Sequence, residues 1–93
     1  MNKVKIFFEK FNGPMLDRDC YVLDMEDNVL CECEQGEYAV FECAKSKKIK
    51  VKMTGFFNKP KIEVEPGKSY YVGYGKITYL LNLPQRIYIE ERN

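Results

Sequence analysis

The sequence predicts an all-β protein that folds as a two-sheet antiparallel β-sandwich of about seven to nine short strands, of the immunoglobulin or transthyretin type, with little or no helix. Three observations predict this fold class. Apolar and polar residues alternate with a period of two along almost the whole chain, and the helical period is almost absent. Turn-forming residues interrupt the alternation at intervals of about 8–12 residues. The chain has 7 Tyr, 6 Phe and no Trp, and Tyr suits strands because one end packs while the hydroxyl reaches water.

The N-terminal half predicts four strands, each with apolar residues on one face. We expect them at Val4–Phe8, Cys20–Asp24, Val29–Glu34 and Tyr38–Cys43. In the first strand the alternation leaves Phe7 pointing outward, and Asn12-Gly13-Pro14 supplies a turn after it. Asp27-Asn28 predicts a hairpin between the second and third strands, and Gln35-Gly36 separates the third from the fourth.

The C-terminal half predicts five further strands. We expect them at Lys48–Met53, Lys61–Glu65, Tyr70–Tyr74, Ile77–Leu81 and Arg86–Glu91. The clearest is Lys48–Met53, in which lysines alternate strictly with aliphatic residues and Met. Pro66-Gly67 predicts a tight turn. Two segments, Leu16–Tyr21 and Thr78–Leu83, could instead be helical, and Cys31, Cys33, Phe41, Ile49 and Val51 are expected in the core.

Length and composition indicate one folded domain over residues 1–93. The 93 residues are 45% apolar and 31% charged, which is ordinary for a globular domain. The N-terminal residues alternate charged and apolar side chains and contain neither the 7–15-residue apolar core of a secretory signal nor the roughly 20 residues of a membrane helix. We therefore expect a cytoplasmic protein without a membrane span, although export is possible if a native leader is missing from this sequence.

Several residue patterns argue against an enzyme. The chain has no His, which excludes Ser-His-Asp and Cys-His catalysis and His-based metal sites. Gly73-Tyr74-Gly75-Lys76 lacks the remaining glycines of a phosphate-binding loop. The carboxylate pairs Glu32/Glu34 and Glu63/Glu65 are expected on the outward faces of their strands, in solvent and outside the walled pocket that a catalytic carboxylate pair needs. We expect no catalytic residues and no cofactor.

The four cysteines allow a core, a metal or a redox interpretation. Zinc sites usually use C-x(2–4)-C spacing, whereas Cys31 and Cys33 are alternate residues of one predicted strand, about 7 Å apart. A disulfide is disfavoured in a reducing compartment. Free Cys behaves as a small apolar residue. We therefore favour core packing and expect no metal site.

Charge is divided unevenly along the chain and defines the candidate binding residues. Nine acids and one base lie between Asp17 and Glu42, and nine lysines and two glutamates lie between Lys45 and Lys76. The two segments either neutralise each other in the fold or give a bipolar surface that steers an acidic partner. The candidate binding residues are Lys48, Lys50, Lys52, Lys61, Tyr71 and Tyr74. Lysines among aromatic residues are typical of proteins that bind single-stranded nucleic acid, but Glu63 and Glu65 could pair with these lysines.

From Cys20 to Tyr74 the chain resembles a known family. The segments that carry the resemblance are Val22-Leu23-Asp24, Asn28-Val29-Leu30, Gly36-Glu37-Tyr38, Ile49-Lys50-Val51, and the run from Ile62 to Val72 with Pro66-Gly67-Lys68 inside it. They resemble the uncharacterised bacterial β-sandwich family called domain of unknown function 2846 and its PEGA-like relatives. The resemblance implies a sandwich fold with a binding or scaffolding role, and no catalytic residues. Many members are secreted or lipid-anchored.

Together these patterns predict a non-enzymatic interaction module that binds a protein partner or associates with itself through a sheet edge or face. One alternative is binding of single-stranded nucleic acid or another polyanion through the Lys48, Lys50 and Lys52 face. Another is binding of a small ligand or carbohydrate through exposed tyrosines.

Overall fold

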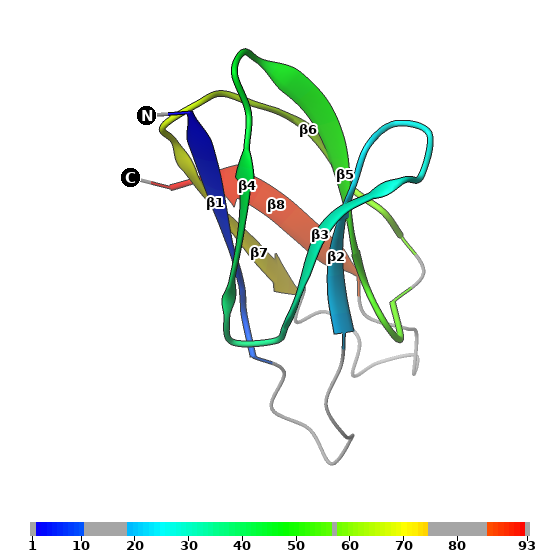
Figure 1. Ribbon diagram of the computed structural model, residues 1–93. Coiled ribbons are helices and arrows are strands. Elements are labelled where there is room, and N and C mark those ends of the chain that lie inside the picture. Colours follow the sequence, from blue (N-terminus) through cyan, green and yellow to red (C-terminus); the bar gives the residue numbers. More distant parts are fainter. Residues whose placement is uncertain (1, 11–18, 57, 75–85, 93) are drawn as a thin grey trace.

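Two four-stranded β-sheets, packed face to face, form the structured part of the computed structural model, which describes residues 2–10, 19–56, 58–74 and 86–92 (Figure 1). The strands are β1 (Lys3–Phe8), β2 (Asp19–Leu23), β3 (Val29–Glu34), β4 (Tyr38–Glu42), β5 (Lys47–Met53), β6 (Lys61–Val64), β7 (Ser69–Tyr74) and β8 (Ile87–Glu91). The described residues contain no helix. The prediction of an all-β, two-sheet sandwich is therefore confirmed.

The two sheets have the strand orders β4-β1-β7-β8 and β3-β2-β5-β6. Of the six described strand pairings, five are antiparallel, and β1 pairs with β7 in parallel. The predicted sandwich was antiparallel throughout, so the β1–β7 pair is a correction. Parallel pairing is possible here because a long stretch of chain separates β1 from β7 and no tight turn has to join them.

The predicted strand bounds agree with these eight strands to within one residue. The helical alternative for Leu16–Tyr21 is wrong where it can be tested, because residues 19–21 begin β2, and residues 16–18 lie outside the described part. The strand expected at Ile77–Leu81 and the helix considered at Thr78–Leu83 also lie outside it. No helix in the described residues could cross a membrane.

The core lies between the sheets and consists of the inward side chains of the alternating strands. Its fully buried members include Val4, Ile6, Phe8, Cys20, Val22, Ile49, Val51, Met53, Val64 and Val72. Ile49 and Val51 are buried as predicted, whereas Cys31, Cys33 and Phe41 are only half-buried and pack against the core. These three residues lie on β3 and β4, which are edge strands, so neighbouring strands cover them on one side only.

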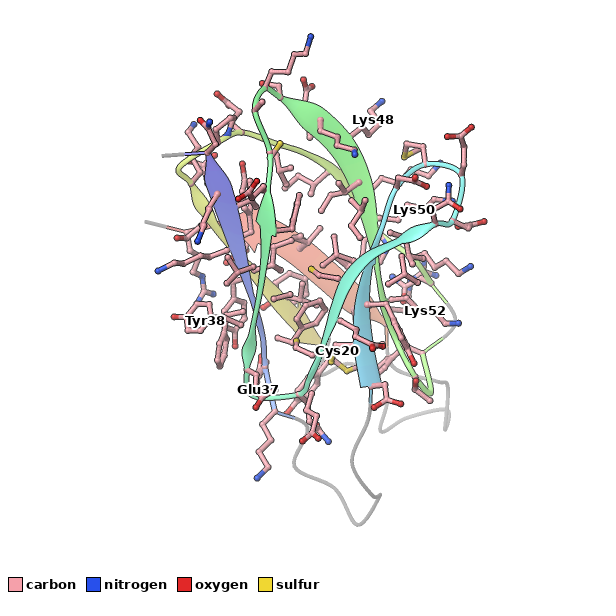
Figure 2. The ribbon with its side chains drawn as sticks, viewed as in Figure 1. Cys20, Glu37, Tyr38, Lys48, Lys50 and Lys52 are labelled. Carbon is pink, nitrogen blue, oxygen red and sulfur yellow. The ribbon has the colours of Figure 1, made fainter. Side chains whose placement is uncertain are left out.

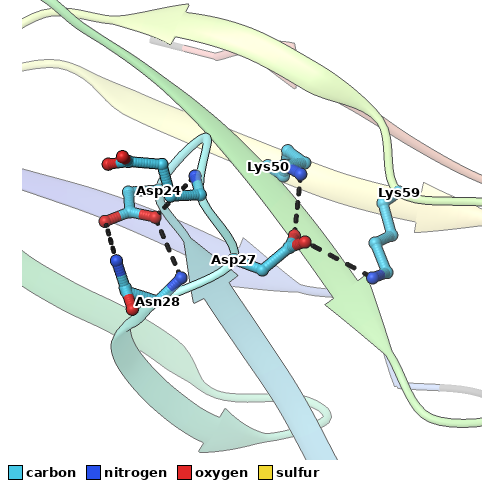
Figure 3. A network of polar contacts seen from close by, with 6 residues as sticks. Asp24, Asp27, Asn28, Lys50 and Lys59 are labelled. Atoms are coloured by element: carbon cyan, nitrogen blue, oxygen red, sulfur yellow. Dashed lines mark hydrogen bonds and ion pairs between the residues drawn. The ribbon is translucent and has the colours of Figure 1, made fainter.

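The β2–β3 hairpin has the turn that the sequence predicts, built around a single carboxylate. Asp24 Oδ1 accepts hydrogen bonds from the backbone N–H groups of Glu26 (2.8 Å) and Asn28 (2.9 Å), and Asp24 Oδ2 accepts one from Asn28 Nδ2 (3.0 Å) (Figure 3). These bonds to Asn28 and Glu26 hold the pKa of Asp24 below its ordinary value. Asp27 adopts a left-handed conformation with φ of 68°, which Asp tolerates better than most residues.

Candidate binding surfaces

The four predicted lysines do lie together, on the outer face of the β3-β2-β5-β6 sheet. Lys48, Lys50 and Lys52 point away from the sandwich along β5 (Figure 2). The register of β5 with β6 places Lys61 directly across from Lys50. We call Lys48, Lys50, Lys52 and Lys61 the lysine face. Their grouping follows from strict alternation on β5 and from antiparallel pairing with β6.

Acidic residues partly neutralise the lysine face. Lys50 Nζ lies 2.7 Å from Asp27 Oδ1, with 14% of the lysine side chain exposed, and Lys59 Nζ lies 4.0 Å from the same oxygen (Figure 3). The bond and the charge of Lys50 hold the pKa of Asp27 below its ordinary value. Glu63 lies across from Lys48 in the register. The basic and acidic segments are thus joined at Asp27.

The remaining acids of this sheet lie on the side away from β6. Glu32 and Glu34 on the edge strand β3 pair in register with Tyr21 and Asp19 of β2. Lys52 Nζ lies 5.8 Å from the centre of the Tyr21 ring. The outer face therefore changes from basic at β5 to acidic at β3. Two ion pairs, of Lys50 and Lys59 with Asp27, join the two charged segments, and the outer face is also bipolar. Steering of an acidic partner stays a prediction.

The predicted tyrosines do not join the lysine face. Tyr71 lies on β7, in the opposite sheet, and its side chain points out of that sheet, beside Phe7. Tyr74, also on β7, packs inward against the core. The sequence interleaves tyrosines with lysines between residues 45 and 76, but β5 and β7 belong to different sheets. A single site containing all six predicted residues is therefore wrong.

Instead, aromatic side chains from neighbouring strands meet on the outer face of the β4-β1-β7-β8 sheet. The ring centres of Phe7 and Tyr38 are 5.1 Å apart with a 58° tilt, and those of Phe7 and Tyr71 are 5.8 Å apart at 28°. Tyr88 lies over Gly73, close to Tyr71. We call Phe7, Tyr38, Tyr71 and Tyr88 the aromatic face. Figure 2 shows Tyr38 on the side of the sandwich opposite the labelled lysines.

Polar contacts fix the centre of the aromatic face. Tyr71 Oη donates a 2.6 Å hydrogen bond to Glu9 Oε1. Burial of the hydroxyl and this bond raise the pKa of Tyr71 to about 12. The guanidinium of Arg92 lies 3.9 Å from the centre of the Tyr71 ring, a cation–π contact, and its Nε donates to Glu90 Oε2 at 2.8 Å. These contacts, one at the hydroxyl and one over the ring, fix the orientation of Tyr71 at the centre of the face.

The outer part of the aromatic face is open to solvent. Tyr38 is 59% exposed and Tyr88 is 39% exposed, and Val40 beside Tyr38 is 42% exposed. A hollow of about 400 Å³ is lined by Phe7, Tyr38, Ser69, Tyr70, Tyr71 and Arg92. Exposed aromatic residues gathered in one patch are typical of binding surfaces.

The sequence does not reveal this face, because its residues come from four separate strands. The alternation correctly placed Phe7 outward on its strand. The alternation does not give the order of the strands within the sheet, and only the parallel pairing of β1 with β7 brings Phe7 beside Tyr71. Antiparallel pairing of β1 with β4 adds Tyr38 on the other side.

Two of the four cysteines lie side by side, which the sequence did not reveal. Cys20 on β2 lies directly across from Cys33 on β3, and their thiols are hydrogen-bonded. Both are free thiols, and burial raises the pKa of Cys20 to about 12 and that of Cys33 to about 11. Such thiols are unreactive because little thiolate forms. Among the described residues, no three Cys, Asp or Glu side chains are placed to hold a metal ion.

No family model and no curated protein matches this chain. The resemblance to the uncharacterised sandwich family therefore stays a prediction.

Proposed function

We propose that this protein is a non-enzymatic binding module whose binding surface is the aromatic face. The observation that carries the proposal is the contact of Phe7 with both Tyr38 and Tyr71 across three adjacent strands. Aromatic side chains offer a large contact area and lose little conformational entropy on binding. Because Glu9 and Arg92 already hold Tyr71, a ligand would meet a rigid surface and pay little to order it.

The second candidate function is binding of a polyanion through the lysine face. It is supported by the register that places Lys61 across from Lys50 and beside the β5 lysines. The ion pair of Lys50 with Asp27 counts against it, because a phosphate would have to compete with a carboxylate 2.7 Å away. We therefore rank it below the aromatic face. A cytoplasmic location stays a prediction for either function.

Site-specific photo-crosslinking in cells tests the proposal without assuming a class of ligand. A photoreactive phenylalanine analogue replaces Tyr38 on the aromatic face or, as the matched control, Tyr21 on the outer face of the other sheet. We expect a reproducible adduct at position 38 that Phe7→Ser removes, and none at position 21. Equal adducts at both positions, or an adduct at position 38 that survives Phe7→Ser, would contradict the proposal.

A further inference from the structure

The aromatic face is bordered by a row of cations on the same sheet. Along β1, Lys3, Lys5 and Phe7 share one face, and the register places Lys5 across from Ser69 and Phe7 across from Tyr71. Alternate residues are about 7 Å apart along a strand. The outer face of the sheet therefore carries two neighbouring rows of side chains, each of which runs across the strands. One row contains Lys5 and Ser69, and the next contains Tyr38, Phe7 and Tyr71.

A second hollow lies beside the row that contains Lys5 and Ser69. Its volume is about 450 Å³, and its lining residues are Lys3, Lys5, Gly67, Lys68 and Ser69. It shares the lining residue Ser69 with the aromatic hollow, so the two hollows lie next to each other. A ligand that spans both would place a planar group against the rings and a negative group among the lysines.

The charges near these hollows leave cations available to an anion. Most neighbouring acids are already bonded, since Glu90 pairs with Arg92 and Glu65 and Glu91 pair with Lys68. Glu9 accepts a hydrogen bond from the Tyr71 hydroxyl. Lys3 and Lys5, by contrast, form no ion pair within the described residues. Glu42 lies across from Lys3 in the register and also forms no ion pair with a described residue.

We infer that the ligand of this face is single-stranded nucleic acid, its bases stacked on Tyr38, Phe7 and the Arg92–Tyr71 pair and its phosphates on Lys3 and Lys5. This inference rests on the proposed function and names its ligand. Bases stack on aromatic rings and on guanidinium planes, and lysines neutralise phosphates. Three stacking groups on three strands fit a strand of several nucleotides better than one mononucleotide. The inferred nucleic-acid surface is thus on the β4-β1-β7-β8 sheet, whereas the sequence predicted it on the lysine face of the other sheet.

Fluorescence anisotropy with a labelled oligothymidylate of about twelve nucleotides tests the inference, because single-strand sites span about 4–16 nucleotides. We expect binding near 50 mM salt, with a log–log salt slope of about −1.5 to −2 for two or three phosphate contacts. Tyr38→Ala should weaken binding roughly 5- to 100-fold, as expected for the loss of one stacked base. Lys5→Gln should weaken it less and reduce the slope by about 0.7.

Matched variants on the opposite sheet are the controls. Tyr21→Ala and Lys48→Gln remove one ring and one positive charge from the other face and should leave binding unchanged. Glu42→Gln removes the unpaired acid beside Lys3 and should strengthen binding. Circular dichroism and urea unfolding confirm that each variant is folded.

Three results would overturn the inference. One is the absence of binding at low salt, and another is loss of binding on Lys48→Gln but not on Lys5→Gln, which would favour the lysine face. A third is equal affinity for a duplex, because paired bases cannot stack on the rings. If the oligonucleotide does not bind but the crosslink at position 38 persists, the aromatic face is a binding surface for another ligand, and only the nucleic-acid inference fails.

Discussion

Gly73 and Tyr88 provide a sharp test of how the aromatic face is packed. Gly73 lies on β7, directly across from Tyr88 on β8. A Cβ atom at position 73 would lie 2.6 Å from Tyr88 Oη, 2.7 Å from Tyr88 Cζ and 3.0 Å from Tyr71 Cε1. Carbon contacts are optimal at about 3.5–4.0 Å. Gly73→Ala therefore forces the Tyr88 ring away from β7.

The sign of the effect depends on whether Tyr88 is present. Ala is preferred to Gly in a strand interior by about 0.5–1 kcal/mol. In the Tyr88→Ala background only the 3.0 Å contact with Tyr71 Cε1 remains, so Gly73→Ala should raise the free energy of unfolding by up to that amount. In the native background, overpacking costs about 1–3 kcal/mol, so the same substitution should lower the free energy of unfolding by about 1 kcal/mol. The coupling free energy between the two positions is then about 1–2 kcal/mol.

Urea unfolding of the four proteins in this double-mutant cycle measures the coupling, provided that the m-values agree. A shift of 1 kcal/mol corresponds to about 4–8 °C in Tm for a domain of this size, so melting curves give a second readout. Equal stabilisation of both backgrounds by Gly73→Ala would refute the clash of a Cβ atom at position 73 with Tyr88. Equal destabilisation in both would assign the clash to Tyr71 instead of Tyr88.

Three further predictions concern single titratable groups. Because the pKa of Asp24 is lowered in the folded state, its stabilisation is present above the unfolded pKa of about 4 and is lost as pH falls. Asp24→Ala should lower Tm at neutral pH and flatten the fall in Tm on acidification, and an unchanged acid profile would contradict this. The pKa of Tyr71 is raised to about 12, so its share of stability should disappear as pH rises from about 10. Tyrosinate absorbance should show that Glu9→Gln brings this ionisation to lower pH. The buried Cys20 thiol, with its pKa raised to about 12, should react with an aromatic disulfide reagent only as fast as the protein unfolds. Rapid labelling of native Cys20, mapped by mass spectrometry, would show that it is accessible.

The strands could be predicted because each has one buried face and a strict period of two. In β5, Ile49, Val51 and Met53 are buried and the lysines between them point outward. A shift of one residue would bury the lysines, so local sequence determines which side chains face the core. The same rule placed Phe7 outward. The β2–β3 hairpin could be predicted separately from its turn residues Asp27 and Asn28, because the carboxylate contacts of Asp24 in this turn are local in sequence.

The spatial neighbours of each side chain and its degree of burial could not be predicted from the alternation. Alternation gives the direction of Cys31 and Phe41 but not their position at the sheet edges, and this position leaves them half-buried. Tyr71 was grouped with the lysines because they are close in sequence, whereas its neighbours Phe7 and Glu9 are more than sixty residues away along the chain. Such contacts depend on how the two sheets are assembled from non-consecutive strands.

The arrangement of charge also indicates whether stacking or electrostatic attraction should supply most of the affinity of the aromatic face. Among the described cations beside the aromatic face, only Lys3 and Lys5 lack ion pairs, so few counterions are released when a nucleic-acid strand binds. A protein that bound through many lysines would show a steep salt slope, and the lysine face, with four lysines, belongs to that class. On the aromatic face, stacking at about 1–3 kcal/mol per base has to supply most of the affinity. Removal of the Tyr38 ring should therefore cost more than removal of the Lys5 charge, and the difference should widen as salt rises, because salt screens the lysine but not the ring.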